Sequence, residues 1–141
     1  MVNKRNVILV IACLAIISAF FPWYSHHLQN TALDQAAAGR QAESLHTAEK
    51  AASMNPLSVS ALFTLAGAQQ RLGWREEARR TLIKATELQP ENYQTWEQLA
   101  LYERNDWSMP NEARTHFEKS VELNPQDQQL KLEANLSPNG S

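Results

Sequence analysis

The chain has 141 residues, a formal net charge of −2, four glycines and a single cysteine. This length allows one domain of modest size, and one cysteine excludes an internal disulfide. Residues 25–141 carry 11 basic and 15 acidic side chains, and this acidic balance argues against nucleic acid as a partner.

An apolar run opens the chain. Every residue but Ser18 between positions 7 and 21 is apolar, and the run follows two basic residues. As a helix, residues 7–24 would be about 27 Å long, close to the ~30 Å thickness of the hydrocarbon layer of a bilayer. We therefore predict a cytoplasmic tail and transmembrane anchor at residues 1–24. The residues predicted at the membrane interfaces are Lys4, Arg5, Trp23 and Tyr24.

The basic residues around the run predict its orientation. Because the next basic residue after Arg5 is Arg40, the positive-inside rule puts the N-terminus in the cytoplasm and the remainder outside a cell or inner membrane. The reversed orientation is one alternative. A cleaved signal peptide is another, but no A-x-A-like cleavage site follows the run and its aromatic end is a poor cleavage site. We favour a retained single-pass anchor.

Three prolines then recur at spacings of 34 and 35 residues, at Pro56, Pro90 and Pro125. Each ends a helical pattern, and a residue that favours helix N-caps follows two positions later. A period of this length is typical of stacked helix pairs, so we predict an all-α solenoid behind the anchor. The predicted parts are a degenerate unit 25–56, units 57–90 and 91–125, a capping helix 126–134 and a flexible tail 135–141.

Small and large residues alternate inside these units as close helix packing requires. Two antiparallel helices approach closely where Ala or Gly removes bulk, and larger side chains fill the remaining space. Gly73 suits the turn inside the middle unit, and Gly39 takes the same place in the weak first unit, whose first helix we expect to start near Ser25. One residue is inserted between Asn105 and Pro110. The predicted packing residues are Leu62, Leu65, Ala66, Ala78, Leu82, Ala85, Trp96, Leu99, Ala100, Ala113, Phe117 and Ser120.

These positions resemble the tetratricopeptide repeat family over residues 25–134, most closely in units 57–90 and 91–125. The resemblance implies a right-handed superhelix of helix pairs, whose first helices line a concave groove for peptides or partner helices. Within the family, the chain is similar to short bacterial repeat segments tethered to the envelope. Those segments include ones that follow O-antigen-ligase-like enzymes and ones in membrane-anchored assembly factors.

The family pattern implies which residues face the groove. Some members grip acidic C-termini with Lys, Arg and Asn, where this chain has Phe63, Glu97 and Leu101, so such a partner is disfavoured. Phe63 and Leu101 are the preferred contact residues, with packing against neighbouring helices as the alternative. The residues carried over to the groove are Ser60, Phe63, Gly67, Gln70, Gln94, Glu97, Leu101 and Arg104.

Arg71, Arg75 and Arg79 form a candidate basic patch for anionic lipid or an acidic partner, with a solvated helix face as the alternative reading. The adjacent pair His26 and His27 lacks the i, i+4 spacing of metal ligands on one helix. No phosphate-binding loop or nucleophile motif occurs in the sequence. We therefore expect no catalytic, cofactor or metal site and no enzyme activity.

Two good repeat units bury little apolar surface, so we expect a larger membrane protein as partner. Unit 57–90 carries +2 and unit 91–125 carries −4, which would also allow two copies to associate head to tail. The predicted function is a membrane-anchored adaptor or accessory subunit of a bacterial-type envelope complex. The alternative is a cleaved, secreted or periplasmic chaperone-like binding protein.

Overall fold

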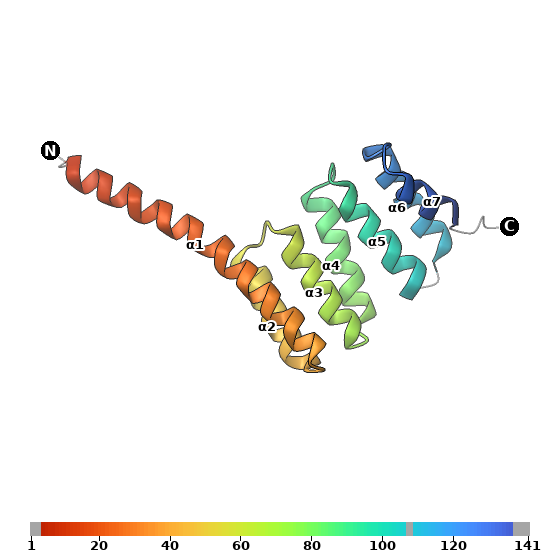
Figure 1. Ribbon diagram of the computed structural model, residues 1–141, viewed down its shortest axis with the longest axis horizontal. Coiled ribbons are helices and arrows are strands. Elements are labelled where there is room, and N and C mark those ends of the chain that lie inside the picture. Colours follow the sequence, from red (N-terminus) through yellow and green to blue (C-terminus); the bar gives the residue numbers. More distant parts are fainter. Residues whose placement is uncertain (1–3, 107–108, 137–141) are drawn as a thin grey trace.

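The computed structural model of the protein describes residues 4–106 and 109–136, with side chains described for all of these except 4, 5, 10, 14–17, 19, 110, 135 and 136. The residues described form helices and turns without a strand, and Figure 1 shows paired helices stacked in a row. The prediction of an all-α solenoid is confirmed. The helices are α1 (Lys4–Ala37), α2 (Gln41–Met54), α3 (Val59–Arg71), α4 (Arg75–Leu88), α5 (Tyr93–Asp106), α6 (Pro110–Leu123) and α7 (Gln128–Leu136).

Two predicted segments fall partly outside these bounds. The segment between Asn105 and Pro110, where one residue is inserted, includes positions 107 and 108, which lie outside the residues described. Of the predicted tail 135–141, positions 135 and 136 belong to α7, and positions 137–141 lie outside the residues described.

Helix α1 runs without a break through the position at which we expected a separate helix to begin. Pro22 lies inside it, and the helix continues past this position although an interior proline removes one backbone hydrogen bond and its ring crowds the carbonyl four residues earlier. The expected start near Ser25 is therefore wrong. The C-terminal half of α1 serves as the first helix of the array, since one face of it is buried at helical spacing. Its buried residues are Ser25, Leu28, Gln29, Ala32 and Ala36.

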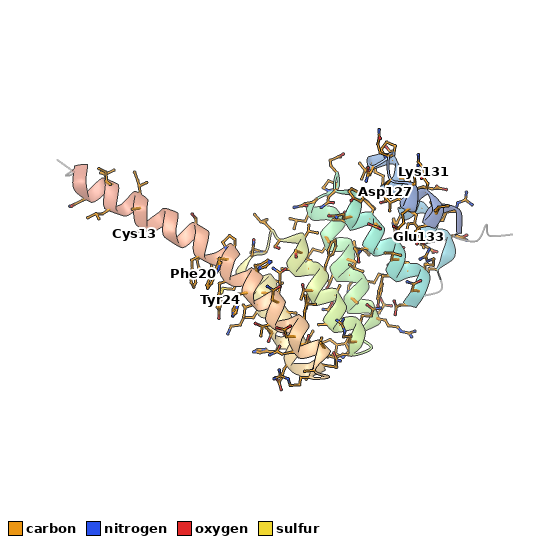
Figure 2. All side chains as sticks on the ribbon, in the orientation of Figure 1. Cys13, Phe20, Tyr24, Asp127, Lys131 and Glu133 are labelled. Atoms are coloured by element: carbon orange, nitrogen blue, oxygen red, sulfur yellow. The ribbon has the colours of Figure 1, made fainter. Side chains whose placement is uncertain are left out.

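The N-terminal half of α1, red in Figure 1, projects away from the stacked helices. Taking the residues that the structure describes, none of the helices combines the length and the apolar character needed to cross a membrane, and the predicted anchor is not supported by this finding. Trp23 is 63% exposed, and Tyr24 stacks on Phe20 with ring centroids 5.6 Å apart (Figure 2). The side chains of Lys4 and Arg5 lie outside the description.

The core follows the predicted alternation of small and large side chains. Ala66 of α3 packs with Ala78 and Leu82 of α4 and with Leu99 of α5, which joins two repeat units. A second cluster, in which Ala32 is one member, joins α1, α2 and α3. Among the predicted packing residues, Leu65 and Trp96 are partly exposed. Those confirmed as buried are Leu62, Ala66, Ala78, Leu82, Ala85, Leu99, Ala100, Ala113, Phe117 and Ser120.

Two buried serines form hydrogen bonds between α1 and α2. Ser25 donates its hydroxyl proton to the carbonyl of Ala51 at 2.9 Å, and Ser44 donates to the carbonyl of Ala32 at 2.8 Å. Both bonds link α1 to α2 and satisfy hydroxyl groups that burial would otherwise leave unpaired. The first helix pair is therefore joined by polar contacts as well as by packing.

Substitution by alanine is expected to have opposite effects on stability at two glycines. Gly73 has φ of 76°, a left-handed conformation, so Gly73→Ala should destabilise the protein by about 1 kcal/mol. Gly67 lies inside α3, where an added Cβ would meet only the Arg71 guanidinium at 3.4 Å. Gly67→Ala should therefore stabilise by up to about 1 kcal/mol. Urea unfolding of both variants, followed by circular dichroism, checks the signs, and equal effects would contradict the assignment.

Candidate protein-binding groove

A groove formed by two adjoining hollows runs along one face of α3 and α5. The hollows have volumes of about 200 and 530 Å³ and share Phe63 and Gln98, so they form one continuous surface. The smaller hollow is lined by Phe63, Ala66, Gly67, Gln70, Leu82, Gln98, Leu101, Tyr102, Asn105 and Asp106. The larger is lined by residues 57–60 with Phe63, Gln89, Asn92, Gln94, Glu97 and Gln98.

Most of the residues that the family pattern assigned to a groove line one of these hollows. They are Ser60, Phe63, Gly67, Gln70, Gln94, Glu97 and Leu101. Arg104 does not line either hollow. Its guanidinium lies 5.1 Å from the ring centroid of Phe117 and forms an ion pair with Glu133 of α7. Arg104 therefore holds α7 against the array, which is a structural role.

Phe63 and Leu101, for which the sequence left partner contact and helix packing open, both lie in the groove. Both are partly exposed and line the smaller hollow. Phe63 also packs against two clusters of the core. Packing thus holds part of the Phe63 side chain, and part of each of the two side chains remains exposed in the hollow.

Polar side chains surround these apolar contacts. Gln70 donates from Nε2 to the Asp106 carboxylate at 2.7 Å, and Ser60 donates to Gln29 Oε1 at 2.6 Å. The side chains of Gln94 and Gln98 form no hydrogen bond with any residue described. The groove therefore offers side-chain amides with donors and acceptors that the rest of the described chain does not use.

The charge of the groove is negative. Glu97 and Asp106 are its charged lining residues, and no lysine or arginine of the described chain lines either hollow. Burial raises the pKa of Glu97 above its ordinary value, and the nearby carboxylates of Asp127 and Glu133 raise it further. A cation at this position would be stabilised.

A buried carboxylate behind the groove links three helices. Glu103 is fully buried, and its Oε1 accepts hydrogen bonds from Arg79 of α4 at 2.9 and 2.7 Å. Its Oε2 lies 2.7 Å from Nδ1 of His116 on α6. Burial alone would raise the pKa of Glu103, but hydrogen bonds and charge attraction from His116 and Arg79 outweigh it and hold the pKa below its ordinary value.

The sequence analysis did not identify this carboxylate. A signal was present, because Glu103 follows Leu99 by four positions and Ala100 by three and so lies on the buried face of its helix. A charged residue at such a position requires buried partners. Those partners lie on two other helices, and the repeat pattern does not specify them.

The pairing also corrects an expectation about the surface. Arg79 belongs to an ion pair with the buried Glu103, so Arg71, Arg75 and Arg79 do not form a patch of three free cations. His116 contacts Glu103 and also lies against Trp96, with ring centroids 5.6 Å apart. Within the described part of the chain, no group of three or more His, Cys, Asp or Glu side chains could hold a metal ion.

Known proteins resemble this chain in fold. Residues 59–92 match the tetratricopeptide repeat family. The TPR domain of Sgt2 from Aspergillus fumigatus is similar in structure, with a TM-score of 0.69 and 21% identity over 81% of this chain and 76% of that one. The first TPR of Spaghetti, bound to an HSP90 peptide, has a TM-score of 0.67 and 17% identity over 80% of this chain and 89% of that one.

A bacterial structure has the same architecture. The type III secretion chaperone SycD of Yersinia enterocolitica, in complex with a peptide of the translocator YopD, has a TM-score of 0.64. It is 12% identical over 79% of this chain and 85% of that one. No curated protein sequence matches the chain. These likenesses and the repeat match at residues 59–92 identify the fold of the chain as a tetratricopeptide repeat solenoid.

Proposed function

We propose that this protein is an adaptor that binds a segment of a partner protein in the groove between α3 and α5. The observation that carries the proposal is the continuous hollow in which Phe63 and Leu101 are partly exposed among side-chain amides. Apolar side chains that a fold positions in a concave surface are typical contact residues of protein interfaces.

The neighbours in fold support this reading. Spaghetti is described with a peptide of HSP90, and SycD with a peptide of YopD. Tetratricopeptide repeat folds thus hold peptides in at least these two proteins.

We further propose that residues 1–24 tether the repeats to a cell membrane, with the N-terminus in the cytoplasm and the repeats outside it. The support is the apolar run of residues 7–21 behind Lys4 and Arg5. Exposed apolar side chains of the N-terminal half of α1, such as Ile8 and Ile11, agree with an apolar environment. On this proposal, the partner is a larger membrane protein of an envelope complex. No observation favours the released form.

Photo-crosslinking in intact cells tests both proposals. A photoreactive amino acid at Leu101 of the full-length chain should crosslink to a discrete protein, whereas one at Lys84, exposed on α4, should not. Equal crosslinking from both positions would contradict binding in the groove. An alkaline carbonate wash of the membranes should leave the full-length chain in the pellet. Its recovery in the supernatant would overturn the tether and leave the groove untouched.

A further inference from the structure

The groove contains one carboxylate that the rest of the described chain leaves without a partner. Of its two acidic lining residues, Asp106 accepts a hydrogen bond from Gln70 at 2.7 Å. Glu97 has no hydrogen bond or ion pair with any residue described. It lies nine residues before Asp106, which corresponds to about 14 Å along α5. Glu97 is therefore the charge that a bound segment can neutralise.

The neighbours of Glu97 increase its need for a cation. They are Asp127, just before α7, and Glu133 of α7, which Figure 2 labels at the C-terminal end of the array. Asp127 caps α7 by accepting N–H bonds from Gln129 and Leu130 at 2.9 and 3.2 Å. Glu133 already holds the guanidinium of Arg104. Both carboxylates raise the pKa of Glu97, so neither of them neutralises its charge.

Two amides next to Glu97 fit the backbone of an extended chain. Gln94 and Gln98 are four residues apart on α5, so they lie on the same helix face as neighbours of Glu97. Neither side chain bonds to a described residue, and each amide can both donate and accept. Phe63 of α3 lines the same hollow and supplies apolar contact. An extended peptide presents backbone N–H and C=O groups of this kind along its whole length.

On the basis of the proposed function, we infer that the groove selects an extended internal segment of its partner that places a lysine or arginine side chain against Glu97. The backbone of the segment bonds to Gln94 and Gln98, and an apolar side chain contacts Phe63. The occupant is a peptide and not a membrane surface, because the groove lacks the basic side chains that anionic headgroups require. An acidic C-terminus would place like charges against Glu97.

Binding of three peptide pools to the full-length chain tests this inference. Each pool holds acetylated and amidated nonapeptides with degenerate positions around a central Lys, Ala or Glu. In low salt, fluorescence anisotropy should show the Lys pool binding about tenfold more tightly than the Glu pool, with the Ala pool between them. Glu97→Gln should remove the difference between the Lys and Ala pools. The matched control Glu118→Gln, exposed on α6, should preserve it.

The remaining outcomes separate this inference from the proposed function. Two results would overturn the preference for a basic segment. One is equal binding of all three pools, and the other is binding of the acidic peptide SRMEEVD as tightly as the Lys pool. Either result would leave peptide binding in the groove intact, provided that Phe63→Ala with Leu101→Ala abolishes it. Absence of binding to every pool, or binding that the double variant does not change, would overturn the proposed function itself. Thermal unfolding of each variant confirms that it is folded.

Discussion

Glu103→Ala is expected to destabilise the protein by about 3 kcal/mol at pH 7, because the change leaves Arg79 and His116 without the carboxylate that joins them. The Glu103 side chain is fully buried, whereas those of Arg79 and His116 are 27% and 22% exposed. Water can reach the two partners in part, so the loss should fall at the lower end of the range for broken buried ion pairs. Thermal unfolding followed by circular dichroism should show a midpoint lowered by about 10–15 °C.

The control for this variant is the same substitution at an exposed ion pair. Glu118→Ala removes the partner of Arg114 on the surface of α6 and should change stability by less than about 0.5 kcal/mol. Glu103→Gln keeps the shape of the side chain and should lie between the two. A Glu103→Ala variant as stable as the Glu118→Ala variant would show that the buried carboxylate does not hold the helices together.

The same carboxylate predicts a pH dependence with a definite sign. Its pKa is lower in the folded protein than its ordinary value of 4.5, so the folded state favours the charged form. The stability that this provides is fully present above the unfolded pKa and is lost as the pH falls through the folded pKa. The gap in stability between the wild type and Glu103→Gln should therefore narrow below about pH 4.5. A gap that widens on acidification would contradict the assignment.

Phe117→Ala should cause the largest loss of stability, about 3–5 kcal/mol, through the cavity that it leaves. The ring is fully buried on α6, and the guanidinium of Arg104 lies over it. Losing the ring should also loosen α7, because Arg104 pairs with Glu133 of that helix. Urea unfolding measures the loss, and hydrogen exchange should show faster opening of α7 than in the wild type.

The control for Phe117→Ala is an equivalent substitution outside the array. Phe20→Ala removes a ring that is 50% exposed on the N-terminal half of α1 and should change stability by less than about 0.5 kcal/mol. If the two alanine variants unfold alike, Phe117 is not part of a close-packed core. Phe117→Ala could lower the stability without faster hydrogen exchange in α7. That result would show that the pairing of Arg104 with Glu133 does not depend on the Phe117 ring.

The parts of the fold that sequence could predict are those that depend on spacing. A small residue at Ala78 and a larger one at Leu82 follow from the need of two helices to pack closely, and both are buried. Gly73 was predictable because a tight turn requires a left-handed residue. These requirements recur in each repeat unit, so the same sequence pattern appears several times in one chain and can be recognised.

Features that depend on a single contact could not be predicted in the same way. The Glu103 carboxylate meets a guanidinium 24 residues before it and an imidazole 13 residues after it, on different helices. Nothing in the repeat period selects those partners. The continuity of α1 was also missed, because its composition changes near Ser25 while its helical backbone continues. Arg104 was assigned to the groove from its position in the repeat, but it pairs with Glu133 of α7, a partner that the repeat period does not specify.

Because α1 is one continuous helix, the number of residues in it determines the direction in which the groove faces, relative to the N-terminal end of the helix. Each residue in an α-helix turns the chain by about 100° and advances it by 1.5 Å. One residue added between Pro22 and Ser25 would thus rotate the repeat array by about 100° about the axis of α1, relative to the end that starts at Lys4. The length of this segment therefore determines the rotation of the repeat array about the axis of α1. Where one end of α1 is fixed, it determines the side from which a partner can reach the groove.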